Sequence, residues 1–167
     1  VAPSGSPATG ASYGTDGAGN TTFSLSLTND DGTSNLTNVN SGIYALHNGG
    51  QGDEITLALD AVSGDIIGSA HGKTYFTISN TDSEVFLTQD ANNNIWHSDS
   101  TDDNDVDSIT GSADGSNDIT FNINLVQTIT DADGDSADAV LNLTQALAGD
   151  QGTGYVFNFY DDGPQAI

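Results

Sequence analysis

Apolar and polar residues alternate along much of this 167-residue chain. In residues 21–28 (TTFSLSLT), the apolar residues Phe23, Leu25 and Leu27 occupy every second position. A period of two places apolar side chains on one face of a β-strand. Alternation and short apolar runs together predict nine strands, at residues 21–28, 43–46, 54–60, 65–70, 74–79, 84–89, 119–130, 137–144 and 155–160.

Gly, Asn and Asp cluster between these segments, as is typical of turns. Helical periodicity is nearly absent, and only residues 143–147 could form a helical turn. Many short strands separated by turns predict an all-β protein, an antiparallel β-sandwich with long loops. The length suits one domain, which we expect to span residues 20–167. Residues 1–19 are rich in Gly, Ala and Ser and are expected to form a linker that leads into the first strand.

The charge balance excludes several classes of partner. The chain has 24 acidic residues against one basic residue, Lys73, and its formal net charge is −23. Binding to nucleic acid or to an anionic membrane surface requires Lys or Arg, so neither is expected. No apolar run is long enough to cross a bilayer, and we therefore expect no membrane insertion.

No recognisable catalytic motif is present in the sequence. It contains no phosphate-binding loop, no dinucleotide-binding fingerprint and no Ser-His-Asp signature. Pairs of carboxylates arise by chance when 22 of the residues are Asp. We therefore expect that the protein is not an enzyme.

The acidity raises the question of what holds the chain together, since it contains no Cys and disulfides are excluded. Charge of this magnitude opposes compaction and favours disorder. The regular alternation of apolar residues nevertheless indicates a folded domain. Several bound calcium ions would reconcile the two observations by supplying positive charge.

Three groups of Asp residues are candidate calcium ligands. The first is Asp131, Asp133 and Asp135, where alternate carboxylates and the adjacent Gly134 suit a tight calcium-binding turn without the spacing of an EF-hand. The second is the pair Asp161 and Asp162, directly after the last predicted strand. For each group the alternative is a solvated acidic turn without a metal.

The third group lies in residues 90–117, a polar stretch long enough to suggest a functional loop. Its candidate metal ligands are Asp99, Asp102, Asp103, Asp105 and Asp107. An ion with an open coordination position here could also receive an outside ligand. The candidate ligand-binding residues are Asp102, Asp103, Asp105 and Trp96, where Trp96 is either a stacking platform or a core residue.

Other polar residues are expected to have ordinary roles. Residues 49–55 (GGQGDEI) faintly resemble a calcium-binding nonapeptide repeat, but they occur once and are predicted to form a loop. His47, His71 and His97 show no spacing typical of metal ligands. We expect each of them to be a structural or surface residue.

The order of these motifs resembles that of a known family. It includes residues 13–17 (YGTDG), 95–97 (IWH), 130–137 (TDADGDSA) and 161–164 (DDGP). Together they resemble the type I secretion target repeat domains of giant bacterial RTX adhesins. The resemblance implies export to the bacterial cell surface and folding in extracellular calcium.

The chain looks most similar to one branch of that family, known from an Antarctic ice-binding adhesin and a Vibrio haemagglutinin. The branch acts as a calcium-dependent peptide-binding domain, in which calcium contacts the peptide directly. The resemblance therefore implies a module that binds peptide or protein termini on target cells and adjoins neighbouring adhesin domains. A calcium-rigidified spacer of the adhesin stalk and a calcium-dependent lectin are the alternatives.

Overall fold

The computed structural model describes residues 17–99, 105–114, 118–144 and 155–160. Within these ranges the chain is all-β, and every paired strand is antiparallel. The strands are β1 (Ala18–Asn29), β2 (Asn38–His47), β3 (Gly50–Leu59), β4 (Ile66–Ala70), β5 (Lys73–Thr81), β6 (Glu84–Gln89), β7 (Ile95–Trp96), β8 (Val106–Ser108), β9 (Phe121–Asp131), β10 (Ser136–Asn142) and β11 (Asn158–Tyr160). The predicted antiparallel β-sandwich class is confirmed.

The largest sheet has six strands in the order β6-β5-β4-β3-β2-β7. Strands β2 to β6 follow one another as hairpins, while β7 adds to the free edge of β2. Alternate residues of this sheet, such as Ile55 and Leu57 of β3, are fully buried on its inner face. The alternation read from the sequence therefore marks the face that meets the core.

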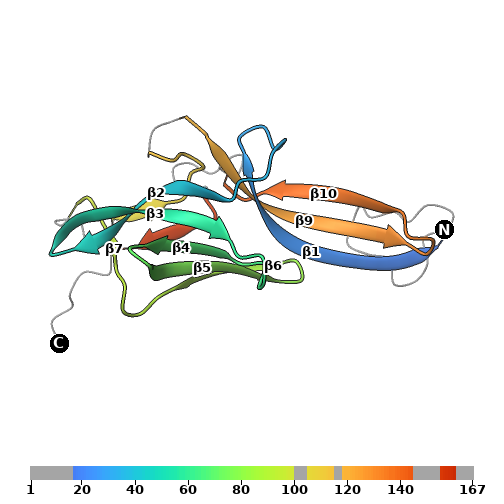
Figure 1. The fold of residues 1–167 in the computed structure, drawn as a ribbon, viewed down its shortest axis with the longest axis horizontal. Helices are drawn as coiled ribbons and strands as arrows, with labels where there is room; N and C mark the ends of the chain where they lie inside the picture. Colours follow the sequence, from blue (N-terminus) through green and yellow to red (C-terminus); the bar gives the residue numbers. More distant parts are fainter. Residues whose placement is uncertain (1–16, 100–104, 115–117, 145–154, 161–167) are drawn as a thin grey trace.

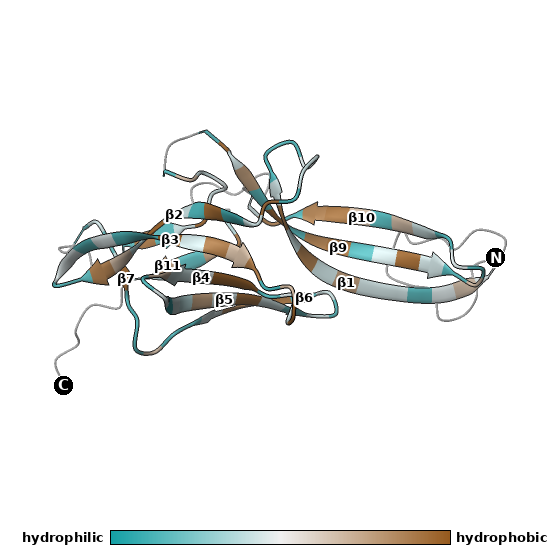
Figure 2. Ribbon diagram, viewed as in Figure 1, coloured by the Kyte–Doolittle hydropathy of each residue, from teal (hydrophilic) through white to brown (hydrophobic). Residues whose placement is uncertain are grey.

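A second sheet, β1-β9-β10, runs along the long axis of the molecule (Figure 1). Its base packs into the core through Leu27 of β1 and through Phe121 and Ile123 of β9. Its other half extends beyond the six-stranded sheet as an arm, with side chains that are mostly exposed. Figure 2 shows that β10 is apolar near its end, yet Val140 there is 64% exposed.

One hydrophobic core joins the layers. β1 lies over the six-stranded sheet, and the Asn80 side chain of β5 donates a hydrogen bond to the Phe23 carbonyl of β1 at 3.2 Å. The short β8–β11 pair closes the core, since Phe159 of β11 packs against Phe76 of β5 with ring centroids 4.8 Å apart. This pair also carries Asp107, one of the candidate site residues.

The structure confirms the nine predicted strands and corrects two predicted loops. Residues 90–117 contain the short strands β7 and β8, which the sequence pattern missed. The loop predicted at residues 49–55 is wrong, because β3 begins at Gly50. Gly52 faces β2 so closely that a Cβ atom there would lie 2.8 Å from the Ala45 carbonyl oxygen. Gly52, one of the glycines that indicated a loop, thus allows two strands to approach.

The boundary predictions are affected only slightly. β1 begins at Ala18, inside the predicted linker of residues 1–19, and residues 1–16 lie outside the described part of the chain. The helical turn predicted at residues 143–147 also falls largely outside it. Among the described residues, no helix has the length and apolar character needed to span a membrane.

Candidate functional site

The first acidic cluster is the turn that joins β9 to β10 at the tip of the arm. Asp131, Asp133 and Asp135 each offer one carboxylate oxygen, and these atoms lie within 4.8 Å of one another. The sequence predicted this grouping. Asp131 is half-buried and the other two are exposed.

Backbone hydrogen bonds shape this turn. One oxygen of the Asp131 carboxylate accepts from the backbone N–H groups of Gly134 at 3.1 Å and Asp135 at 3.0 Å. Gly134 has a φ of 102°, a conformation that other residues adopt only with strain. The Asp-x-Asp-Gly-Asp sequence therefore forms this turn by itself, without help from the rest of the fold.

Contact between Asp131 and Asp133 perturbs the pKa values of their carboxyl groups. A side-chain hydrogen bond between Asp131 and Asp133 lowers the pKa of the Asp131 carboxyl and raises that of the Asp133 carboxyl. The charge of Asp131 also raises the pKa of Asp133. Two carboxylates that compete for one proton can instead share one cation, which is a chemical property expected of a calcium-binding turn.

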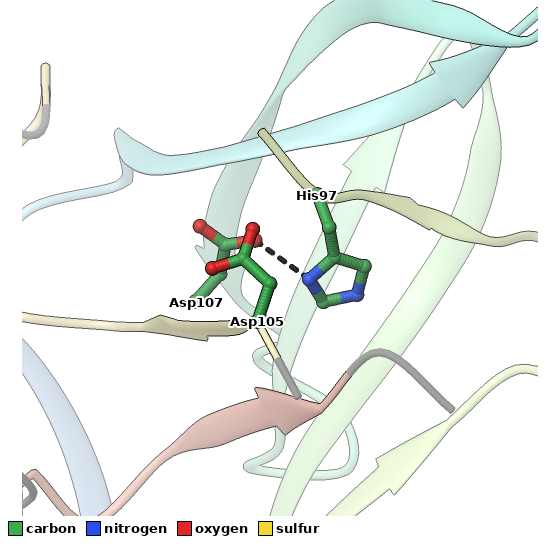
Figure 3. Close-up of side chains that lie close together, drawn as sticks. All are labelled: His97, Asp105 and Asp107. Atoms are coloured by element: carbon green, nitrogen blue, oxygen red, sulfur yellow. Dashed lines mark ion pairs between the residues drawn. The ribbon is translucent and has the colours of Figure 1, made fainter. Parts of the chain in front are cut away.

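The second cluster lies at the edge of the core and consists of His97, Asp105 and Asp107. Each offers one ligand atom, again within 4.8 Å of one another. Figure 3 shows the imidazole ring and the two carboxylates converging from separate chain segments. His97 follows β7, and Asp107 lies in β8.

The strand pairings explain why this cluster is partly buried. Asp107 pairs with Phe159, and residues directly opposite each other project from the same face of a sheet. Phe159 is buried in the core, so Asp107 is directed inward as well. His97 follows the buried Ile95 by two positions and lies on the same side of its strand.

Burial changes the electrostatics of the second cluster. The side chains of His97 and Asp107 are only 10% and 31% exposed, and His97 Nδ1 lies 2.8 Å from Asp107 Oδ2. Burial raises the pKa of the Asp107 carboxyl, the positive charge of His97 partly opposes that rise, and the charge of Asp105 adds to it. This environment differs from that of the exposed turn at the arm tip.

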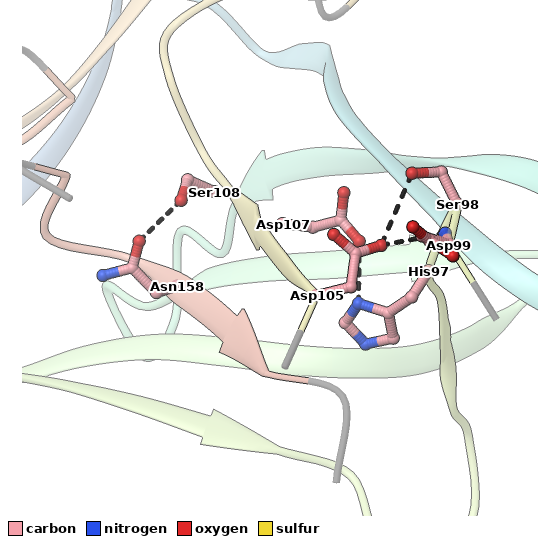
Figure 4. A network of polar contacts seen from close by, with 7 residues as sticks. All are labelled: His97, Ser98, Asp99, Asp105, Asp107, Ser108 and Asn158. Carbon is pink, nitrogen blue, oxygen red and sulfur yellow. Dashed lines mark hydrogen bonds and ion pairs between the residues drawn. The ribbon is translucent and has the colours of Figure 1, made fainter. Parts of the chain in front are cut away.

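Hydrogen bonds around the cluster hold Asp105 and β8 in place (Figure 4). Asp105 Oδ2 accepts from the backbone N–H of Asp99 at 3.0 Å and from the Ser98 hydroxyl at 3.4 Å. The Ser108 hydroxyl donates to Asn158 Oδ1 at 2.6 Å and thereby ties β8 to β11. Hydrogen bonds from residues outside the cluster therefore hold Asp105 and the strand that carries Asp107 in place.

The remaining predicted site residues fall into two groups. Asp102, Asp103, Asp161 and Asp162 lie outside the described residues. Trp96 is half-buried in β7 and faces away from the buried Ile95. Its ring meets Tyr44 edge-on, with centroids 6.4 Å apart, so it lies on the outer face of the sheet and not in the core.

Sequence reasoning missed His97 as a member of this cluster. Its partners Asp105 and Asp107 follow it by eight and ten positions, a spacing that matches no short ligand motif. The tertiary pairing of β8 with β11 brings them together. The only sequence signal was the presence of a His next to the Asp-rich stretch.

Ion pairs within the protein neutralise little of its charge. In the described ranges, two ion pairs are present, His97 with Asp107 and His71 with Asp53. The second pair is exposed, with side chains 65% and 62% accessible. Lys73, the single basic residue besides the histidines, forms no ion pair with the described carboxylates.

Fold and site together define an acidic antiparallel β-protein with two clusters suited to cations. The chain belongs to the family described as a domain of unknown function, DUF5801, which matches residues 4–144. No curated protein and no solved structure gives a significant match.

Proposed function

We propose that this chain is a calcium-dependent peptide- or protein-binding module of a secreted bacterial RTX adhesin. It works outside the cell, at the bacterial surface, and bound calcium takes part in contacting the ligand. Its targets are peptide or protein termini on other cells, and its neighbours are further adhesin domains. The resemblance of the DADGD and DDGP motifs to RTX adhesin domains supports this placement.

The turn at the arm tip is the observation on which the proposal rests. It brings three carboxylates within 4.8 Å of one another, and the protein offers almost no basic side chains to neutralise them. Calcium prefers hard oxygen ligands of this kind, and extracellular modules bind it with Kd values of about 0.1–1 mM. A chain of this composition would remain loose in a low-calcium cytosol and become rigid outside the cell.

The outer face around Trp96 and Tyr44 supports a role in ligand binding. The two aromatic rings meet edge-on at the β7 edge of the six-stranded sheet. Partly exposed aromatic surface of this kind suits the side chains of a bound peptide.

A peptide and glycan array, probed in millimolar calcium and again in EGTA, tests the proposal. We expect calcium-dependent peptide hits that share a terminal residue. Trp96→Ala should weaken these hits, whereas Phe86→Ala should not, because Phe86 is exposed on β6 at the opposite edge of the same sheet. Peptide binding that survives EGTA would contradict the calcium mechanism.

Two other array results would redirect the assignment. Hits on sugars that a free monosaccharide competes away would indicate a calcium-dependent lectin. A blank array together with calcium-dependent melting would indicate a structural spacer of the adhesin stalk.

A further inference from the structure

The polar atoms at the centre of the second cluster contact each other and, among the described residues, have no further hydrogen-bond partner. The two atoms are His97 Nδ1 and Asp107 Oδ2, and both are buried. They lie only 2.8 Å apart and form an ion-pair contact. A buried ion pair usually needs additional hydrogen bonds to offset the cost of its burial, so this pair calls for a physical cause.

We propose that His97, Asp105 and Asp107 bind a divalent transition metal ion, with zinc as the best-matched ion. A ring nitrogen and a carboxylate oxygen that approach to 2.8 Å are arranged like neighbouring ligands of one cation. An ion between them would satisfy both atoms and offset the cost of their burial. The site uses only described residues and does not depend on the proposed adhesin function.

The nitrogen ligand separates this site from a calcium site. Calcium and magnesium take oxygen ligands, whereas imidazole nitrogen suits zinc and other transition ions. One His and two carboxylates make three protein ligands, the number found in zinc sites that keep a fourth position open. A water molecule or an outside carboxylate can occupy that position.

The surroundings of the cluster match those of metal sites. Ligating carboxylates are usually held by hydrogen bonds from a second layer of residues. Asp105 receives such bonds from Ser98 and from the backbone of Asp99. Asp107 is fixed because β8 is tied to β11 through Ser108 and Asn158. The donor set is therefore oriented before an ion arrives.

A second His–Asp pair in the same protein supplies the contrast. His71 and Asp53 form an exposed ion pair, and neither is part of a three-residue cluster among the described side chains. Solvent can satisfy their polar atoms. The His71–Asp53 pair is therefore a simple histidine–carboxylate contact, and it lacks the features that point to a metal at His97.

The test is a titration of the chelator-treated full chain with zinc chloride in saturating calcium, followed by calorimetry. We expect one equivalent of zinc to bind. His97→Gln should weaken that binding by more than about 100-fold, since losing even an outer partner of a ligand costs about 10–100-fold. His71→Gln is the matched control and should leave zinc binding unchanged. Cobalt should give the visible absorption bands of a low-coordinate site in the wild type and not in His97→Gln.

Two further measurements keep the result independent of folding and of calcium. Calcium titration of His97→Gln should match that of the wild type, which shows that the variant is folded and that its calcium sites are intact. In wild-type protein, the His97 ring Nδ1 resonance should shift on zinc addition. Absence of zinc binding in the wild type, equal binding in His97→Gln, or a ring that responds to pH alone would overturn the proposal and leave a structural ion pair.

Discussion

The two acidic clusters contain similar residues in different settings. The arm-tip turn holds three carboxylates in five consecutive positions and is largely exposed. The cluster at the core edge gathers His97, Asp105 and Asp107 from two chain segments, and two of its buried atoms have no hydrogen-bond partner beyond their contact with each other. Sequence spacing alone produces the first cluster, whereas tertiary packing produces the second.

This contrast shows what an acidic residue implies in a protein with 22 Asp. Proximity of carboxylates is common in such a chain and carries little information by itself. Burial is informative, because a buried polar atom without a partner has a free-energy cost that the fold must offset. Composition therefore predicts that the protein needs cations, while the packing indicates which kind of cation each cluster would suit.

Removal of all divalent ions should produce the largest effect. We expect EGTA to lower the melting temperature by more than about ten degrees, because each occupied calcium site contributes about 2.7 kcal/mol at one hundred times its Kd. Since EGTA also removes zinc, adding back calcium alone separates the clusters. Calcium alone should restore most of the stability. Recovery that requires zinc would show that the second cluster contributes more to stability than the calcium sites. A melting temperature unchanged by EGTA would show that calcium does not stabilise the protein.

Truncation of an apolar side chain should have very different effects in the core and on the arm. In the core it should destabilise the protein nearly as much as EGTA does, whereas on the arm it should have almost no effect. Phe76 is fully buried against Phe159, so Phe76→Ala should lower the free energy of unfolding by about 3–5 kcal/mol. Val140→Ala on the exposed arm should change it by less than about 0.5 kcal/mol. Urea unfolding in saturating calcium measures both. A large effect of Val140→Ala would show that the arm is covered in solution.

The smallest expected effect is local to the arm tip. Asp133→Asn removes a negative charge that repels Asp131, so it should slightly stabilise the calcium-free arm while reducing the stabilisation that calcium adds. Hydrogen exchange of the Ile129 and Ala137 amides, measured with and without calcium, reports both effects. In the variant these amides should exchange slightly more slowly without calcium, and calcium should slow them less than in the wild type.

Asp82→Asn supplies the control for that experiment. Asp82 lies in the turn between β5 and β6 with a φ of 51°, which Asn tolerates, and the change in net charge is the same. Equal responses from the two variants would show that calcium acts through overall charge and not through the arm-tip turn.

The strands could be predicted because alternation survives wherever one face meets the core. β7 and β8 could not, since two and three residues are too few to show a period and since their neighbours fix their position. The glycines within residues 49–52 indicated a loop because glycine is common in turns. Gly52 instead allows the close approach of β3 to β2.

The candidate site divides in the same way. Asp131, Asp133 and Asp135 could be read from the sequence because the turn that unites them is local. His97 could not, because its membership depends on the pairing of Asp107 with Phe159, some fifty residues further along the chain. Contacts between distant segments leave no pattern in a single sequence.

The strand order also determines which contacts are hardest to form during folding. Strands β2 to β6 pair with their neighbours in sequence across short turns, whereas Leu25 of β1 pairs with Leu125 of β9. Closing a loop of that length has a larger entropic cost than closing a hairpin. Strands β2 to β6 can therefore assemble from local pairings, whereas the pairing of β1 with β9 in the arm must wait until distant parts of the chain have met.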